Sequence, residues 1–249
     1  MKKLLFASAM AAAATLTATS ALAQVTGYAG FSGSTSEVQV SGVEANVDAV
    51  GVHGAVFAPI NETLGVQFDA SYTDAEDADG VLAGTAHLIG NLGDQMRVGA
   101  FVGAAEFADE TAVAGGVEGQ VNYDRVTLAA NAAYGTVDEF DLDIWGVSGE
   151  ARFFASDNFR IDGGLGWASA DADGFEAEGW TAGLGGEARF YGPASVFLAY
   201  NYAELDELDV AANTITLGMR FSFDGSLKER DRAGASFGGI QNLLTIASF

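Results

Sequence analysis

Residues 145–202 contain two copies of one sequence pattern. The first copy is WGVSGEARFF (145–154), the turn ASDN (155–158) and FRIDGGLGW (159–167). The second copy is WTAGLGGEARFY (180–191), the turn GPAS (192–195) and VFLAYNY (196–202). Apolar and polar residues alternate in both copies with a period of two, which is typical of a strand and not of a helix. The stretch therefore predicts two β-hairpins.

The apolar face of these strands begins and ends with aromatic residues. The bounding aromatics stand eight to ten positions apart, as in the pair Trp145 and Phe153. At ~3.3 Å per residue and a tilt of roughly 40°, that distance matches the ~25 Å apolar band of an outer-membrane barrel. We expect an aromatic girdle at the lipid boundary, made of Trp145, Phe153, Phe159, Trp167, Trp180, Phe190 and Tyr202.

The same alternation extends through the chain and predicts twelve strands. Their expected ranges are 25–34, 45–58, 64–73, 82–91, 96–105, 113–123, 126–135, 144–154, 159–168, 178–190, 196–203 and 212–223. Short turns are expected to alternate with longer acidic connections at 35–44, 74–81, 105–112, 136–143, 169–177 and 204–211. Barrels of the outer membrane place short turns in the periplasm and long loops outside. We therefore expect the acidic connections on the cell surface and both ends in the periplasm.

The first residues have the three parts of a secretory signal. Lys2 and Lys3 precede an Ala- and Leu-rich run, and Ala21-Leu22-Ala23 fits an A-x-A cleavage site. We predict a signal peptide at 1–23 and a mature chain that begins at Gln24. After the signal there is no run of ~18 apolar residues, so no transmembrane helix is expected. The chain has no cysteine, which excludes disulfides and thiolate sites.

The charge balance is strongly acidic. Without Lys2 and Lys3 the chain keeps 9 basic against 34 acidic residues, which argues against a nucleic-acid partner. Of the acids, 21 lie in the six longer connections and their flanks, with no Lys or Arg among them. Such a ring would attract cations to a pore mouth, but acidic loops also serve solubility alone. No run fits the EF-hand pattern, so we expect no metal site beyond loose bridging of lipopolysaccharide by divalent ions.

The last predicted strand carries apolar residues at alternate positions before a terminal phenylalanine: Ile215, Leu217, Met219, Phe221 and Phe223. This pattern resembles the closing strand of the Gram-negative outer-membrane β-barrel superfamily, and porin-like small barrels are the most similar type. The resemblance implies a closed, up-and-down antiparallel barrel over 24–223 that the barrel-assembly machinery reads at Phe223. Residues 224–249 then form a C-terminal periplasmic extension or a plug. A further strand that ends at Phe249 is the competing interpretation.

Charged residues also fall on the face expected to line the lumen. The predicted lumen charge cluster consists of Glu118, Glu150, Arg152, Glu187, Arg189 and Arg220, with Glu150-Arg152 and Glu187-Arg189 as repeated pairs. Charges inside a membrane barrel must face water or each other. The cluster is therefore either a selective constriction or a salt-bridge network that closes the lumen. Many other lumen positions are small, such as Gly164, Gly183 and Gly185, which favours a narrow water-filled passage.

Two function classes remain after these exclusions. Enzymatic activity is not expected, because only His53 and His87 are available and no nucleophile motif such as G-x-S-x-G appears. The first hypothesis is a narrow, weakly cation-selective outer-membrane channel for passive diffusion of small hydrophilic solutes, without cofactors. The alternative is a closed structural or adhesin-like barrel that acts through its acidic surface. The expected partners are outer-membrane lipid, lipopolysaccharide, the assembly machinery, and small solutes or cations.

Overall fold

The computed structural model describes residues 25–76, 78–107, 110–137, 141–172, 175–223 and 225–239. The predicted signal peptide and the alternative strand that ends at Phe249 lie outside these residues. The described chain forms twelve strands and one helix: β1 (Thr26–Val40), β2 (Val43–Pro59), β3 (Leu64–Ala75), β4 (Val81–Leu92), β5 (Met96–Phe107), β6 (Glu110–Asn122), β7 (Val126–Val137), β8 (Leu142–Ser156), β9 (Phe159–Ala172), β10 (Phe175–Tyr191), β11 (Ala194–Leu205), β12 (Val210–Ser222) and α2 (Leu227–Ala233).

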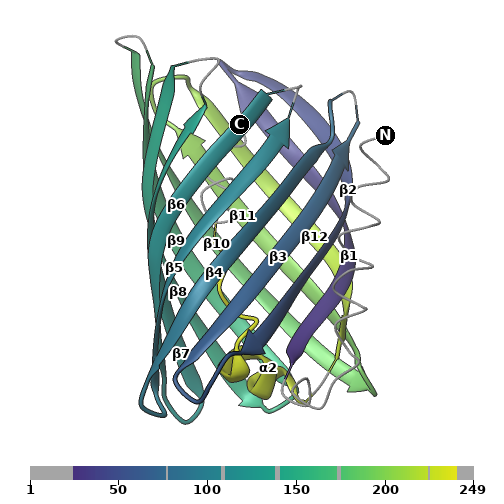
Figure 1. Ribbon diagram of the computed structural model, residues 1–249. Helices are drawn as coiled ribbons and strands as arrows, with labels where there is room; N and C mark the ends of the chain where they lie inside the picture. Colours follow the sequence, from purple (N-terminus) through teal and green to yellow (C-terminus); the bar gives the residue numbers. More distant parts are fainter. Residues whose placement is uncertain are drawn as a thin grey trace, which may run out of the picture.

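The strands close into one antiparallel barrel in which each strand pairs with its neighbours in sequence (Figure 1). Closure is completed by β1 and β12, where Phe31 pairs with Met219 and Tyr28 with Ser222. The fold prediction is thereby confirmed. A closed barrel satisfies every backbone ladder and leaves no free edge, which lipid could not hydrogen-bond.

Large apolar side chains cover the outside of the barrel. Leu165 is 67% exposed, Val102 66% and Leu184 63%, and similar values recur on most strands. Contiguous apolar surface of this extent marks an interaction with lipid or protein. No helix in the described part of the chain is both long and apolar enough to cross a membrane. The strand alternation thus divides each strand into a lipid face and a lumen face.

The prediction of six long acidic connections was wrong, because the strands continue through most of those residues. At the β1–β2 connection only Ser41 and Gly42 remain outside the strands, with φ values of 48° and 81°. Positive φ at both central residues is the mark of a two-residue hairpin turn whose twist matches the strands. Backbone pairing needs no apolar side chain, so the ladder extends into water where both faces of the strands become polar.

Candidate functional site: the barrel lumen and the segment inside it

The chain turns back into the barrel directly after β12. Gly225 has φ 60°, a conformation that favours glycine, and Ser226 then caps α2. The Ser226 hydroxyl accepts from the backbone N–H of Glu229 at 3.2 Å, and the Glu229 carboxylate accepts from the Ser226 N–H at 2.6 Å. This capping box fixes the start of the helix. Figure 1 shows α2 inside the lower end of the barrel. We call residues 225–239 the lumenal segment.

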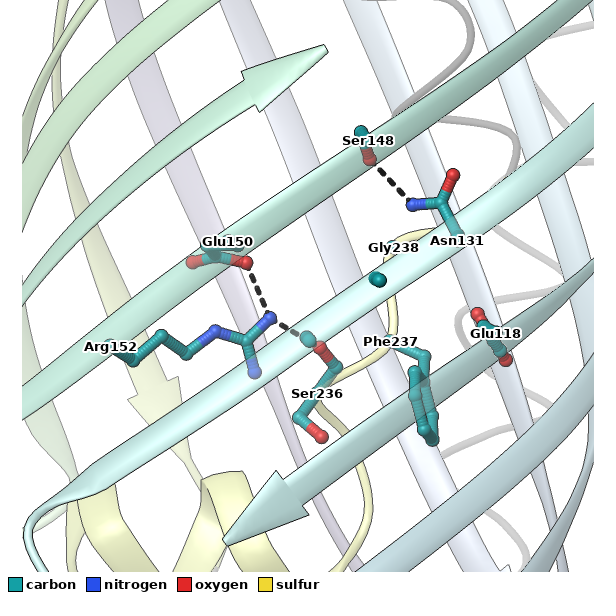
Figure 2. Close-up of a pocket in the computed structure, with 10 residues that line it drawn as sticks. Glu118, Asn131, Ser148, Glu150, Arg152, Ser236, Phe237 and Gly238 are labelled. Carbon is teal, nitrogen blue, oxygen red and sulfur yellow. Dashed lines mark hydrogen bonds and ion pairs between the residues drawn. The ribbon is translucent and has the colours of Figure 1, made fainter. Parts of the chain in front are cut away.

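Arg152 joins the barrel wall to the lumenal segment. Its guanidinium donates to Glu150 at 2.6 Å and to the carbonyl of Ser236 at 2.9 Å (Figure 2). It also donates to Asp231 at 2.7 Å. The hydroxyl of Thr127 donates to the other oxygen of Asp231 at 2.7 Å. The segment thus places a buried carboxylate between a charged donor and a neutral donor of the wall.

Glu187 is the centre of a second charged group. It is almost fully buried and accepts from Arg220 at 2.8 Å and from Arg230 of the segment at 2.6 Å. Ser195 donates to it at 2.5 Å, and Arg160 lies 3.6 Å away. One carboxylate therefore balances guanidinium groups from the wall and from the lumenal segment.

His87 lies between two carboxylates in a third group. Its Nε2 is 2.5 Å from Asp69 and its Nδ1 is 2.6 Å from Glu118. Both ring nitrogens therefore face carboxylate oxygens. Phe237 of the segment stacks over the ring at 6.5 Å. Among the described residues no group of three His, Cys, Asp or Glu side chains is arranged to hold a metal ion.

Arg97 binds the C-terminal part of the lumenal segment. Its guanidinium lies 5.3 Å from the ring centroid of Phe57 and 5.2 Å from that of Phe237, which are cation–π distances. It also donates to the carbonyl of Gly234 and to the hydroxyl of Ser236, both at 3.4 Å. The wall therefore holds the segment by charge, by backbone recognition and by ring packing.

The structure places the predicted lumen charges in separate groups. Glu150 and Arg152 are ion-paired, Glu118 contacts His87, and Glu187 contacts Arg220. The expected pairing of Glu187 with Arg189 is not found among the described contacts. Arg189 pairs in regular register with Ser195, and the register shift follows it, between Arg189 and Tyr191. Its Nε donates to the carbonyl of Gly192 at 2.5 Å.

The predicted girdle residues lie on the outer surface. Trp145 contacts Trp167 at 4.5 Å between ring centroids, and Trp180 contacts Tyr202 at 5.0 Å. Phe153, Phe159 and Phe190 are exposed near the opposite ends of the same strands. In the closing strand, Ile215, Leu217, Phe221 and Phe223 are also exposed, and Met219 pairs with Phe31 of β1.

Above the charged groups the lumen holds open space. A space of about 210 Å³ is lined by residues that include Ser148, Glu150, Asp162, Thr181 and Asn201, and we call it the vestibule. A smaller space of about 20 Å³ lies between Glu118, Asn131, Glu150 and Phe237 (Figure 2).

Several of the small lumen residues make room for polar side chains and not for a passage. A Cβ at Gly183 would come within 2.6 Å of the Asn201 amide oxygen, and one at Gly185 within 2.6 Å of the Asp162 carboxylate. Both polar groups thus lie flat against β10. The glycines therefore widen the lumen less than their size alone predicted.

Acidic side chains follow the aromatic girdle toward the end of the barrel opposite α2. Asp143 lies two residues before Trp145 and accepts from the hydroxyl of Tyr134 at 2.6 Å. Glu204 accepts in the same way from Tyr202 at 2.8 Å. We call these outward acids, with Asp74, Glu106 and Glu178 at equivalent strand positions, the acidic collar. These acids lie on the outward faces of β3, β5, β8, β10 and β11.

Comparisons with known proteins identify the fold. No protein-family model and no curated protein matches the sequence. Among solved structures, the chain is similar to the COG4313 outer membrane channel from Pseudomonas putida F1, at 12% identity, with 80% of this chain and 95% of that chain covered and a TM-score of 0.57. The likeness shows that the chain has the fold of a closed β-barrel of this kind.

Two porins show the same likeness. The NanC porin matches at 10% identity and a TM-score of 0.57, with 77% of this chain and 98% of that chain covered. The KdgM porin in complex with disordered oligogalacturonate matches at 8% identity and a TM-score of 0.54, with 78% and 99% covered. Identities this low show the fold alone, so the use of the lumen must be argued from its residues.

Sequence reasoning missed Arg230 and Asp231 as partners of the wall charges. Two signals pointed to them: the S-x-x-E pattern of Ser226 and Glu229, which marks a helix start, and the alternating charges of KERDR (228–232). It also missed Gln67, Gln120 and Thr127, which are fully buried donors to the segment. For neutral polar residues on a lumen face, the sequence does not indicate which partner they bind.

Proposed function

We propose that this protein is a narrow channel through the outer membrane for passive diffusion of small hydrophilic solutes. The vestibule is the observation that carries the proposal. It is a space inside a closed barrel, and the charged side chains of Glu150 and Asp162 are part of its lining. The similarity in fold to porins and channels supports the same proposal.

We propose further that the channel is weakly cation-selective. The lumen charges nearly balance, because Arg97, Arg152, Arg160 and Arg220 face Asp69, Glu118, Glu150, Asp162 and Glu187. Selectivity must then come from the acidic collar, which raises the concentration of cations at the mouth through its field. Such a field is screened over about 10 Å at 0.1 M salt and about 3 Å at 1 M. The preference for cations should therefore weaken as salt rises.

Swelling of proteoliposomes tests the proposal. Vesicles that hold the purified protein should swell in neutral sugars, more slowly as the sugars become larger. Thr181→Trp narrows the vestibule and should slow the swelling. Leu198→Trp adds the same side chain to the outer face of the neighbouring strand β11, where Leu198 is 56% exposed and does not line the vestibule, and should leave the rate unchanged. Absence of swelling with every solute would contradict the channel.

A second candidate is a closed barrel that binds other surfaces through its outside. The observation in its favour is the acidic collar, because these acids face outward and contribute nothing to the lining of the lumen. On this account, replacement of Asp143, Glu178 and Glu204 by Asn and Gln would abolish a surface phenotype and leave solute influx unchanged. We also propose that lipopolysaccharide and the assembly machinery, through the Phe223 strand, are partners of the chain.

A further inference from the structure

The barrel wall recognises the backbone of the lumenal segment. Four carbonyls of the segment accept from four wall side chains: Asp231 from Gln120, Gly234 from Arg97, Ser236 from Arg152 and Phe237 from Gln67. The donors come from β3, β5, β6 and β8 and are all buried. A tail that had merely collapsed into the lumen would not find a donor at each of these carbonyls. The lumen is therefore a shaped binding site for this stretch of chain.

The wall charges keep partners of their own when the segment is disregarded. Arg152 still has Glu150 at 2.6 Å, and Glu187 still has Arg220 at 2.8 Å. Removal of a partner from a buried pair is costly when it leaves the other charge uncompensated. Because Arg152 and Glu187 each keep a second partner on the wall, withdrawal of Asp231 and Arg230 leaves neither of these two charges isolated. These two wall charges are therefore compensated both with the segment in place and without it.

The segment is attached so that it can move as a unit. It is joined to the barrel through Gly225, and its ion pairs at the rim are long and exposed. Lys228 lies 3.7 Å from Asp124 and 3.8 Å from Asp157, whose side chains are 91% and 72% exposed. At the rim Arg232 also donates to the carbonyls of Tyr123 and Asp124, and the Lys228 N–H donates to the carbonyl of Asp157. The buried contacts of Arg230, Asp231 and Phe237 lie in the lumen, so the position of the segment depends on these contacts and on the rim contacts of α2.

We propose that the lumenal segment is a displaceable plug that sets the conductance of the channel. In the seated state it occupies the charged layer below the vestibule, with Asp231 in the Arg152–Thr127 site and Phe237 against Arg97 and His87. In the displaced state the same layer becomes an eyelet of opposed charges. This inference rests on the proposed channel function and adds to it a ligand for the lumen, namely the chain's own C-terminal segment.

Full-length variants test the plug by the time-averaged current in planar bilayers. Asp231→Asn removes the charge that Arg152 binds and keeps the side chain's size. It should raise the current roughly tenfold or more, because the loss of a buried charged contact is worth at least one decade in an equilibrium. Asp157→Asn removes a charge from the exposed rim pair and should leave the current unchanged. Arg152→Gln combined with Asp231→Asn should raise it by less than the product of the two single effects, because both changes remove the Arg152–Asp231 contact.

Cleavage after folding provides a test that no folding defect can obscure. A protease site placed between Phe223 and Ser226 is cut in the folded, reconstituted protein, and the salt concentration is then raised to release the segment. The current should rise to the level of Asp231→Asn. Equal currents from the intact protein, the Asp231→Asn variant and the cleaved protein would overturn the plug and leave the channel standing. No current from any of the three, the cleaved form included, would contradict the channel function itself.

Discussion

Gly234 is the residue on which the seating of the lumenal segment depends most sharply. Its φ is 147°, and a Cβ added there would fall inside the ring of Phe57. Gly234→Ala should therefore prevent the segment from seating and expose Arg230, which is 4% exposed in the structure. Trypsin should cut after Arg230 faster in the variant than in the wild type, as measured by mass spectrometry.

The control for this change is Gly42→Ala. Gly42 also has positive φ, at 81°, but nothing lies within 4 Å of the added Cβ and it is remote from the segment in the β1–β2 turn. It should introduce similar backbone strain without any effect on cleavage after Arg230. Equal cleavage rates in Gly234→Ala and Gly42→Ala would show that the contact with Phe57 does not hold the segment.

Arg152 is the residue whose loss should cost most stability. It is buried between Glu150 and Asp231, so Arg152→Met leaves two carboxylates without their charged donor. Breaking a buried pair in this way costs about 3–5 kcal/mol. Arg189→Met, at the turn, should cost much less, because Arg189 has no ion-pair partner among the described contacts. Urea unfolding of both variants measures the difference, and equal losses would contradict the assigned role of Arg152.

At the scale of elements, α2 should respond to acid through its cap. The Ser226 backbone N–H donates to the Glu229 carboxylate and lowers its pKa below the ordinary value. A lowered pKa in the folded state adds stability that is present above the unfolded pKa and lost as pH falls through the folded one. Hydrogen exchange of the α2 amides should therefore accelerate below about pH 4, near the ordinary pKa of Glu.

Glu229→Gln separates this cap from the other acids of the chain. Glutamine can still accept from the Ser226 N–H, but it does not titrate. The variant should lose the acid dependence of α2 exchange and keep that of the rest of the barrel. If α2 in Glu229→Gln still loosens with acid as much as in the wild type, the cap is not the group that titrates.

The strands show how much of the fold the sequence could predict. All twelve were predicted from alternation, because a lipid face must be apolar at every second position, as in Leu165 and Trp167 of β9. Their outer ends were not predicted, because beyond the lipid both faces become polar and the alternation disappears. Glu37 and Glu44 lie on opposite strands of one hairpin, although their composition is that of a loop.

The lumen was predictable only in part. Glu150 and Arg152 stand two apart on one strand, so their contact follows from strand geometry alone. The contact of Arg152 with Asp231 joins residues 79 positions apart and depends on the path of the chain after Phe223. Arg189 donates to the carbonyl of Gly192 in the adjacent turn, a partner that strand alternation does not indicate. Long-range pairs and turn contacts carry no periodic signal.

At the scale of the whole molecule, the two ends of the barrel differ in charge, and we expect the acidic collar to face outside. The chain has no cysteine, so single cysteines report orientation cleanly. Ser41→Cys, in the β1–β2 turn at the collar end, should react with a membrane-impermeant maleimide on intact cells. Asp157→Cys, at the α2 end, should react only after the cells are opened. The reverse pattern would invert the barrel in the membrane.

The central claim is that the lumen conducts, and the current of the purified full-length protein in a planar bilayer under a salt gradient tests it most directly. We predict discrete steps of small conductance and a reversal potential displaced toward that of the cation, with a displacement that shrinks as total salt rises. A folded protein that gives no steps, before or after removal of its lumenal segment, would contradict the account.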